Sequence, residues 1–162
     1  MMFVWSHDAF RVGEDGPTHE PVEQEAQIRL MEKLHNHSGR PSVMVLRPAD
    51  ADETTAAWKM AMENIYTPTA LILSRQDVAS VPNTSAEGVK KGAYIVSNDE
   101  NPQVVMIASG SEVSTLMAGA ELLRAEGVRL QIVSVPSEAI FRQQSKEYQA
   151  EVLPQGVARF GL

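Results

Sequence analysis

Short apolar runs alternate with segments of helical periodicity over the first eighty residues of the sequence. The runs at 2–5, 42–46 and 69–73 have strand length, and the stretches at 21–36 and 50–64 between them repeat apolar residues at helical spacing. Strands that are apolar at almost every position are typical of parallel sheets with both faces covered. The alternation predicts an α/β fold built on a mainly parallel sheet.

A second unit of the same kind follows. Its pattern is an apolar run at 104–108, a helix from Ser111 to about 126, a stop at Gly127 and an apolar run at 130–135, with one more helix predicted at 138–152. One strand-helix-strand unit and a helix cannot close a doubly wound sheet, so we expect this unit to be incomplete.

The stretch between the two units is rich in turn-forming residues. Residues 81–102 include Pro82, Asn83 and Gly88, and only 93–96 has the pattern of a strand. We therefore expect two partial domains, at 1–80 and 103–162, joined by a linker at 81–102.

Composition excludes several classes of function. The 162 residues are 43% hydrophobic and 22% charged, as in soluble globular proteins, and the net charge of −7 argues against a nucleic-acid or anionic-membrane surface. The sequence has no cysteine, so disulfides and thiolate metal sites are impossible. No secretory leader and no long apolar run are evident, so a cytoplasmic location is expected.

Histidines and acids are concentrated directly after the first predicted strand. Ser6-His7-Asp8 is followed at 13–21 by the glycine-flanked sequence GEDGPTHEP. Open α/β sheets bind ligands at the carboxyl ends of their strands, so this segment predicts a polar substrate pocket. By contrast, the His-Asn-His run at 35–37 has no further ligand at fixed spacing, and a solvated helix end is the better interpretation than a metal site.

Four residues are candidates for contacting a substrate. His7 can donate to a phosphate or a hydroxyl, and Asp15 can accept from one specific hydroxyl, although it could instead cap its own turn. His19 lies at the start of a predicted helix, where it could exchange a proton with substrate or simply pack. Arg75 ends the third strand with a fork of donors suited to phosphate, but an exposed salt bridge is the ordinary alternative.

The sequence closely resembles the transketolases, thiamine-diphosphate enzymes that move two-carbon ketol units between sugar phosphates. The motifs that carry the resemblance are, in order, SHD at 6–8 with GEDGPTHEP at 13–21, LRPAD at 46–50, PTALILSRQ at 68–76, KGAY at 91–94 and ASGSEV at 108–113. Glu20 departs from the glutamine of the family motif. The resemblance covers almost the whole chain, although transketolases are several times longer.

The resemblance implies a fold and roles for the candidates. The chain looks like the later part of the pyrimidine-binding domain followed by the start of the C-terminal domain, as two incomplete three-layer units. His7 and Arg75 are then expected to bind the substrate phosphate, Asp15 the hydroxyl at C2, and His19 the substrate oxygens beside the thiazolium, as a catalytic residue.

Cofactor residues are not expected in this chain. In the family, thiamine diphosphate and Mg²⁺ are bound by an upstream glutamate and aromatic pocket and by a Gly-Asp-Gly motif with a distant asparagine, none of which occurs here. No residue is therefore assigned to cofactor or metal, and the fragment alone is expected to be inactive. The intact parent is expected to be a homodimer.

Two alternatives stay open. The chain could be a non-catalytic subunit that completes a split thiamine-diphosphate enzyme together with a second polypeptide, because incomplete sheets leave exposed edges that favour pairing. It could also be a relative of deoxyxylulose phosphate synthase or of a 2-oxoacid dehydrogenase, which the GEDGPTH and SRQ motifs make less favoured.

Overall fold

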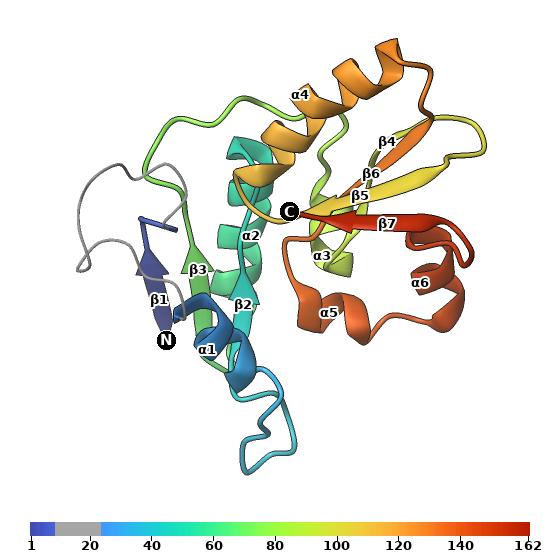
Figure 1. Ribbon diagram of the computed structural model, residues 1–162. Coiled ribbons are helices and arrows are strands. Elements are labelled where there is room, and N and C mark those ends of the chain that lie inside the picture. The colour runs from blue at the N-terminus through green and yellow to red at the C-terminus, as the bar shows by residue number, and fades with distance from the viewer. Residues whose placement is uncertain (9–23) are drawn as a thin grey trace.

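The computed structural model describes residues 1–8 and 24–162, which form two β-sheets with helices packed on them (Figure 1). The first sheet has the order β1-β3-β2 and the second the order β4-β6-β5-β7. The elements of the first part are β1 (Met2–Trp5), α1 (Gln24–Met31), β2 (Met44–Leu46), α2 (Ala51–Glu63) and β3 (Thr69–Ile72).

The first sheet is parallel, as the sequence predicts. Both β1 and β2 pair in parallel with the central strand β3, and all four residues of β3 are buried. Helix α1 packs on one face through Ile28, whereas Ala57 and Ala61 of α2 pack on the other. The predicted start of α2 is confirmed, since the Asp50 carboxylate accepts a hydrogen bond from the backbone N–H of Glu53 at 2.9 Å.

The second sheet is mixed. Its elements are α3 (Ala86–Lys91), β4 (Tyr94–Asn98), β5 (Val104–Ala108), α4 (Glu112–Ala125), β6 (Leu130–Ser134), α5 (Glu138–Arg142), α6 (Lys146–Val152) and β7 (Ala158–Gly161). Strands β6 and β7 run parallel to β5, and β4 runs antiparallel to β6. Helices α3 and α4 contribute to a core on one face, and α5 and α6 to a core on the other.

Two expectations differ from the structure. The single helix predicted at 138–152 is two helices, because the Ser145 hydroxyl accepts a hydrogen bond from Tyr148 N–H at 3.2 Å and so begins α6 anew. Strand β7 was not predicted.

Residues 81–102 also differ from the linker that their turn-rich composition suggests. They contain α3 and β4, and β4 hydrogen-bonds to β6 as the edge strand of the second sheet. Pairing with a distant strand thus gives this segment a fixed place, which local turn propensity does not reveal. Where one domain ends and the next begins stays a prediction.

The two units meet along α2 and the carboxyl end of β2. Ala49 and Ala56 belong to the same buried cluster as Tyr94, Ala108 and Leu130 of the second sheet. Within residues 1–8 and 24–162, none of the helices has the length and apolarity that crossing a membrane requires.

Candidate functional site

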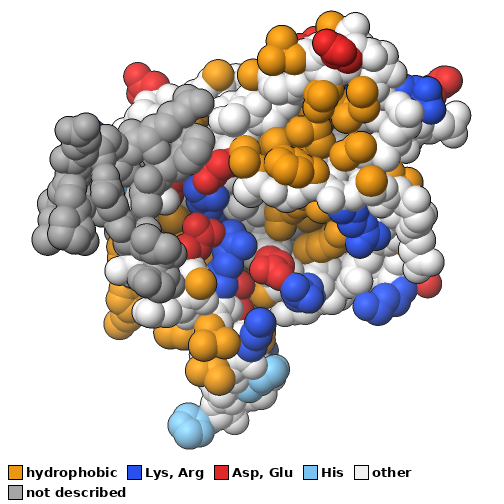
Figure 2. All heavy atoms as spheres, in the orientation of Figure 1, with side chains coloured by type: hydrophobic (Ala, Val, Ile, Leu, Met, Phe, Trp, Pro, Cys, Tyr) orange, Lys and Arg blue, Asp and Glu red, His pale blue; other side chains and the backbone are white. Residues whose placement is uncertain are grey.

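A buried polar cluster lies where the carboxyl ends of the first sheet meet the turn between β5 and α4. We call it the Arg47 cluster, and it consists of Asp8, Arg47, Ser74, Ser109, Ser111 and Glu112. In Figure 2 acidic and basic side chains lie side by side in the middle of the visible face, and hydrophobic side chains gather over α4.

Arg47 joins the two units of the fold. It follows β2 directly, and its Nη2 lies 2.9 Å from Asp8 Oδ2 and 2.8 Å from Glu112 Oε1. Its Nη1 donates to the carbonyl oxygen of Ser109 at 2.8 Å. Glu25 of α1 adds a fourth contact, with an ion pair of 3.6 Å to Nε. One guanidinium therefore links α1, the end of β1 and the start of α4.

Three nearby carboxylates explain how a buried cation is tolerated here. The Arg47 side chain is 7% exposed and the Asp8 side chain is fully buried. Burial disfavours the charged guanidinium, but the hydrogen bond to Glu112 and the charges of Glu25 and Asp8 outweigh it and raise the pKa of Arg47. Arg47 therefore carries its charge at every physiological pH.

Gly110 gives this arginine its space. It has φ of +62°, in the left-handed region, and a Cβ built on it would lie 2.8 Å from Arg47 Cζ. Its N–H also donates to the carbonyl of Arg47 at 3.2 Å. Only glycine suits both this backbone angle and this contact.

Asp8 receives donors from three distant parts of the chain. Its Oδ2 accepts from Arg47, from the Ser74 hydroxyl at 3.1 Å and from the Ser111 hydroxyl at 3.3 Å. Ser111 is the N-cap residue of α4 by position, as the sequence predicts, but its side chain makes no capping hydrogen bond. Its hydroxyl lies between two carboxylates instead, 3.3 Å from Asp8 Oδ2 and 3.4 Å from Glu112 Oε2.

Two of the four predicted substrate residues lie at the carboxyl ends of neighbouring strands of the first sheet. His7 follows β1 and Arg75 follows β3, and these strands are hydrogen-bonded neighbours in which Trp5 pairs with Ile72. Both side chains belong to exposed residues, and His7 Nδ1 is hydrogen-bonded to the Ser6 hydroxyl at 3.0 Å. Asp15 and His19 lie outside the described residues. All four assignments stay predictions.

The supporting residues were missed from the sequence. In the sequence, Arg47 and Glu112 stand out only as parts of motifs, and Asp8 only as a neighbour of His7. The available signal was an arginine directly after an apolar strand, because a cation at the end of a buried strand needs carboxylate partners nearby.

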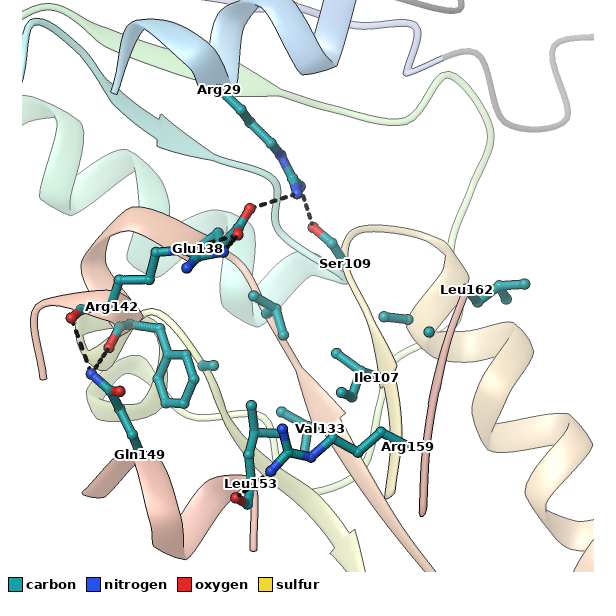
Figure 3. Close-up of a pocket in the computed structure, with 15 residues that line it drawn as sticks. Arg29, Ile107, Ser109, Val133, Glu138, Arg142, Gln149, Leu153, Arg159 and Leu162 are labelled. Carbon is teal, nitrogen blue, oxygen red and sulfur yellow. Dashed lines mark hydrogen bonds and ion pairs between the residues drawn. The ribbon is translucent and has the colours of Figure 1, made fainter. Parts of the chain in front are cut away.

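A pocket of about 480 Å³ opens beside the cluster (Figure 3). Ile107, Val133 and Leu153 give it an apolar wall. Arg29 reaches in from α1 toward Glu138 and toward Ser109, whose hydroxyl accepts from Arg29 at 3.3 Å. The polar side chains at the rim of the pocket therefore already bind one another, through the Arg29–Ser109 hydrogen bond and the Arg29–Glu138 ion pair. Among residues 1–8 and 24–162 no group of three potential metal ligands occurs.

Family comparisons agree with the motifs. The model of the transketolase pyrimidine-binding domain matches residues 1–80, and that of the transketolase-like C-terminal domain matches residues 92–162. The chain belongs to the transketolase family. The first match includes β1 to β3 with His7 and Arg75, and the second includes β4 to β7 with Ser111 and Glu112.

Individual transketolases match nearly the whole chain. The transketolase of Geobacillus stearothermophilus is 46% identical over 98% of this chain and 23% of its own length. A solved transketolase from Leishmania mexicana is 41% identical with a TM-score of 0.86, over 98% of this chain and 22% of that one. A split-gene transketolase described as an inactive beta4 tetramer is 25% identical with a TM-score of 0.69, over 99% and 47% of the two chains. The chain thus spans about 23% of the length of the curated transketolase.

Proposed function

We propose that this chain supplies the sugar-phosphate recognition part of a thiamine-diphosphate-dependent transketolase, which transfers a two-carbon ketol unit from a ketose phosphate to an aldose phosphate. The observation that supports this proposal most directly is the position of His7 and Arg75 at the carboxyl ends of two paired strands, in a chain of the transketolase family.

His7 and Arg75 have the chemistry for a phosphate. An arginine offers a planar fork of donors to phosphate oxygens, and an imidazole can add a further donor. In this proposal Asp15 accepts from the C2 hydroxyl of the sugar, and His19 contacts the substrate oxygens at the reacting end. Recognition of the phosphate would therefore come from the carboxyl ends of β1 and β3.

Thiamine diphosphate is the cofactor that the pyrimidine-binding domain implies, and it supplies the carbanion chemistry when bound. The residues described here do not by themselves fit it with its Mg²⁺, because they contain no cluster of potential metal ligands. No reaction step is therefore assigned to this chain's own residues at the cofactor. We propose that other parts of the enzyme hold both groups, and that this chain alone is inactive.

A second proposal is that the chain binds a partner polypeptide, and the exposed edge strand of the first sheet supports it. Strand β1 is an edge strand, and its residues Met2, Phe3, Val4 and Trp5 are 41–46% exposed although all four are apolar. Edge strands of free-standing sheets are usually protected by charges or by short length. We propose that a polypeptide with the remaining transketolase segments pairs with β1 and covers its side chains.

The split-gene transketolase gives this second proposal a precedent, since that protein is described as inactive in its beta4 form. This chain would then be a module of a split enzyme. A cytoplasmic location, a role in the pentose phosphate pathway and a dimeric assembled enzyme belong to the same proposal.

Reconstitution tests both proposals. The purified chain is mixed with a polypeptide that contains the remaining segments of the Geobacillus stearothermophilus transketolase, together with thiamine diphosphate and Mg²⁺, and ketol transfer is measured. We expect activity from the mixture and from neither part alone. Activity of the chain alone would overturn the proposed inactivity, and a mixture that binds but stays inactive would overturn the proposed catalytic contribution.

Variants of the reconstituted enzyme test the phosphate site. His7→Asn and Arg75→Gln are each expected to raise KM for a ketose phosphate by about tenfold, the worth of one charge-assisted hydrogen bond, and to leave KM for an unphosphorylated ketose unchanged. His37→Asn, at an exposed histidine, is the matched control. Equal effects on both substrates would exclude the assigned role.

A further inference from the structure

The carboxylate of Asp8 links the two chain segments that carry the predicted phosphate-binding residues. Asp8 follows His7 in the chain, and its Oδ2 accepts the hydroxyl proton of Ser74, which precedes Arg75. The same oxygen accepts from Arg47 after β2 and from Ser111 at the start of α4. Three donors that lie 39, 66 and 103 residues away in sequence thus converge on one atom.

We infer that Asp8 is a positioning residue through which the second unit of the fold sets the geometry of the sugar-phosphate site. Its hydrogen bonds hold the end of β1, with His7, and the end of β3, with Arg75, at a fixed separation. Ser111 contacts Asp8 directly, and Glu112 contacts it through Arg47. Both residues belong to the region matched by the C-terminal family model, so this region would influence the position of the two strand ends. That His7 and Arg75 bind a phosphate rests on the proposed function, whereas the fixed separation of the two strand ends does not depend on it.

Burial makes this connection stiff. The Asp8 side chain is fully buried and the Arg47 side chain is 7% exposed, so water cannot readily replace a lost partner. The bond from Arg47 at 2.9 Å is charge-assisted, whereas the Ser74 and Ser111 hydroxyls lie farther from the carboxylate, at 3.1 and 3.3 Å. Removing one donor leaves a buried charge with fewer partners. A change at Ser111 is therefore expected to move Asp8 and the strand ends beside it.

The sharing of Arg47 adds a second link. Its Nη2 lies 2.9 Å from Asp8 and 2.7 Å from the nearer oxygen of Glu112. A single nitrogen that bridges two carboxylates responds to the position of both. Displacement of the start of α4 would thus change the pull of Arg47 on Asp8.

The test uses Ser111→Ala, which removes one donor to Asp8, and compares it with Ser114→Ala. Ser114 is also on α4 and donates its hydroxyl proton to a backbone carbonyl, that of Ser111, at 2.8 Å. The backbone amide signals of His7 and Arg75 are followed by ¹H–¹⁵N NMR of the whole chain, with ¹⁵N relaxation, because neither residue is near position 111 in sequence.

We expect Ser111→Ala to shift both amide signals and to lower both order parameters, and Ser114→Ala to leave them unchanged. Shifts confined to the turn around position 111 would overturn the inference. Asp8→Asn is read only at Arg75, since a substitution next to His7 alters the His7 signal for trivial reasons. An unchanged Arg75 signal in that variant would also count against Asp8.

The reconstituted enzyme separates this inference from the proposed function. In it, Ser111→Ala is expected to raise KM for a ketose phosphate by about threefold to tenfold, as for the loss of one hydrogen bond, with little change in kcat. If the amide signals move but KM for the ketose phosphate does not, the positioning holds and the assigned phosphate site is wrong. If KM rises with unmoved amide signals, the positioning through Asp8 is wrong.

Discussion

Tyr94 of β4 donates its hydroxyl proton to the carboxylate of Glu53 on α2 at 2.7 Å, in the contact between the two units. Glu53 is fully buried and also accepts from the Ser134 hydroxyl at 2.6 Å and from Ala49 N–H at 2.7 Å. Burial raises the pKa of Glu53, and burial together with the charge of Glu53 raises the pKa of Tyr94. The carboxylate thus ties α2 to two strands of the second sheet.

Tyr94→Phe is expected to lower the free energy of unfolding by about 2 kcal/mol, because Glu53 loses a donor and the N–H of Ser85 loses the Tyr94 oxygen as its acceptor. Chemical denaturation measures the loss. Tyr66→Phe is the control, since Tyr66 is 62% exposed and keeps its ring under Arg40. Equal losses in the two variants would show that the buried hydroxyl contributes nothing specific.

Two glycines are expected to respond to alanine in opposite directions. Gly110→Ala places a Cβ against Arg47 and imposes strain at φ of +62°, and should cost about 1 to 3 kcal/mol. Gly119→Ala, inside α4 with open space around its Cβ position, should stabilise by about 1 kcal/mol. Thermal unfolding of both variants checks the signs, and a stabilising Gly110→Ala would contradict the described packing of Arg47.

Local signals in the sequence predicted the parallel sheet and its helices well. The apolar runs located β1, β2, β3, β5 and β6, and the Asp50 capping pattern located the start of α2, because these features depend on residues close in sequence. The strand pattern at 93–96 also predicted β4, but its antiparallel pairing with β6 depends on residues far away in sequence, and the division of the last helix depends on one serine cap. Such features have weak local signals.

The candidate site was predictable only in part. The loop chemistry and family motifs led to His7 and Arg75, and the parallel order of β1 and β3 explains why their strand ends are neighbours. The Arg47 cluster joins residues up to 103 positions apart, and the position of Arg47 after an apolar strand signals that it needs carboxylates but not which distant residues supply them. Arg47, Asp8 and Glu112 therefore had to come from the structure.

Asp50 is expected to be worth more than an ordinary helix cap. Besides accepting from Glu53 N–H, its carboxylate accepts from Val81 N–H at 2.9 Å and from the Thr84 hydroxyl at 3.2 Å. Asp50→Ala should thus cost about 3 kcal/mol, against about 1 kcal/mol for Ser145→Ala, which removes the cap of α6 alone. Urea denaturation measures both, and equal costs would contradict the double role.

Glu32 gives the fold a dependence on pH. Glu32 is 7% exposed, and its Oε1 accepts a hydrogen bond from Val45 N–H at 2.9 Å. This bond joins the end of α1 to β2. Burial raises the pKa of Glu32 to about 7, while the hydrogen bond from Val45 and the charge of Arg29 act in the opposite direction and Glu138 adds to the rise.

Between pH 4.5 and about 7 the folded chain therefore binds a proton at Glu32 that the unfolded chain has released. Its contribution to stability is present below pH 4.5 and is lost as the pH rises to about 7, by up to about 3 kcal/mol. Glu32→Gln should remove this part of the pH dependence, because a glutamine can accept from Val45 without titrating. Denaturant unfolding across this pH range compares both chains, with Glu63→Gln at an exposed position as control. If the control flattens the pH profile as much as Glu32→Gln does, the dependence does not come from Glu32.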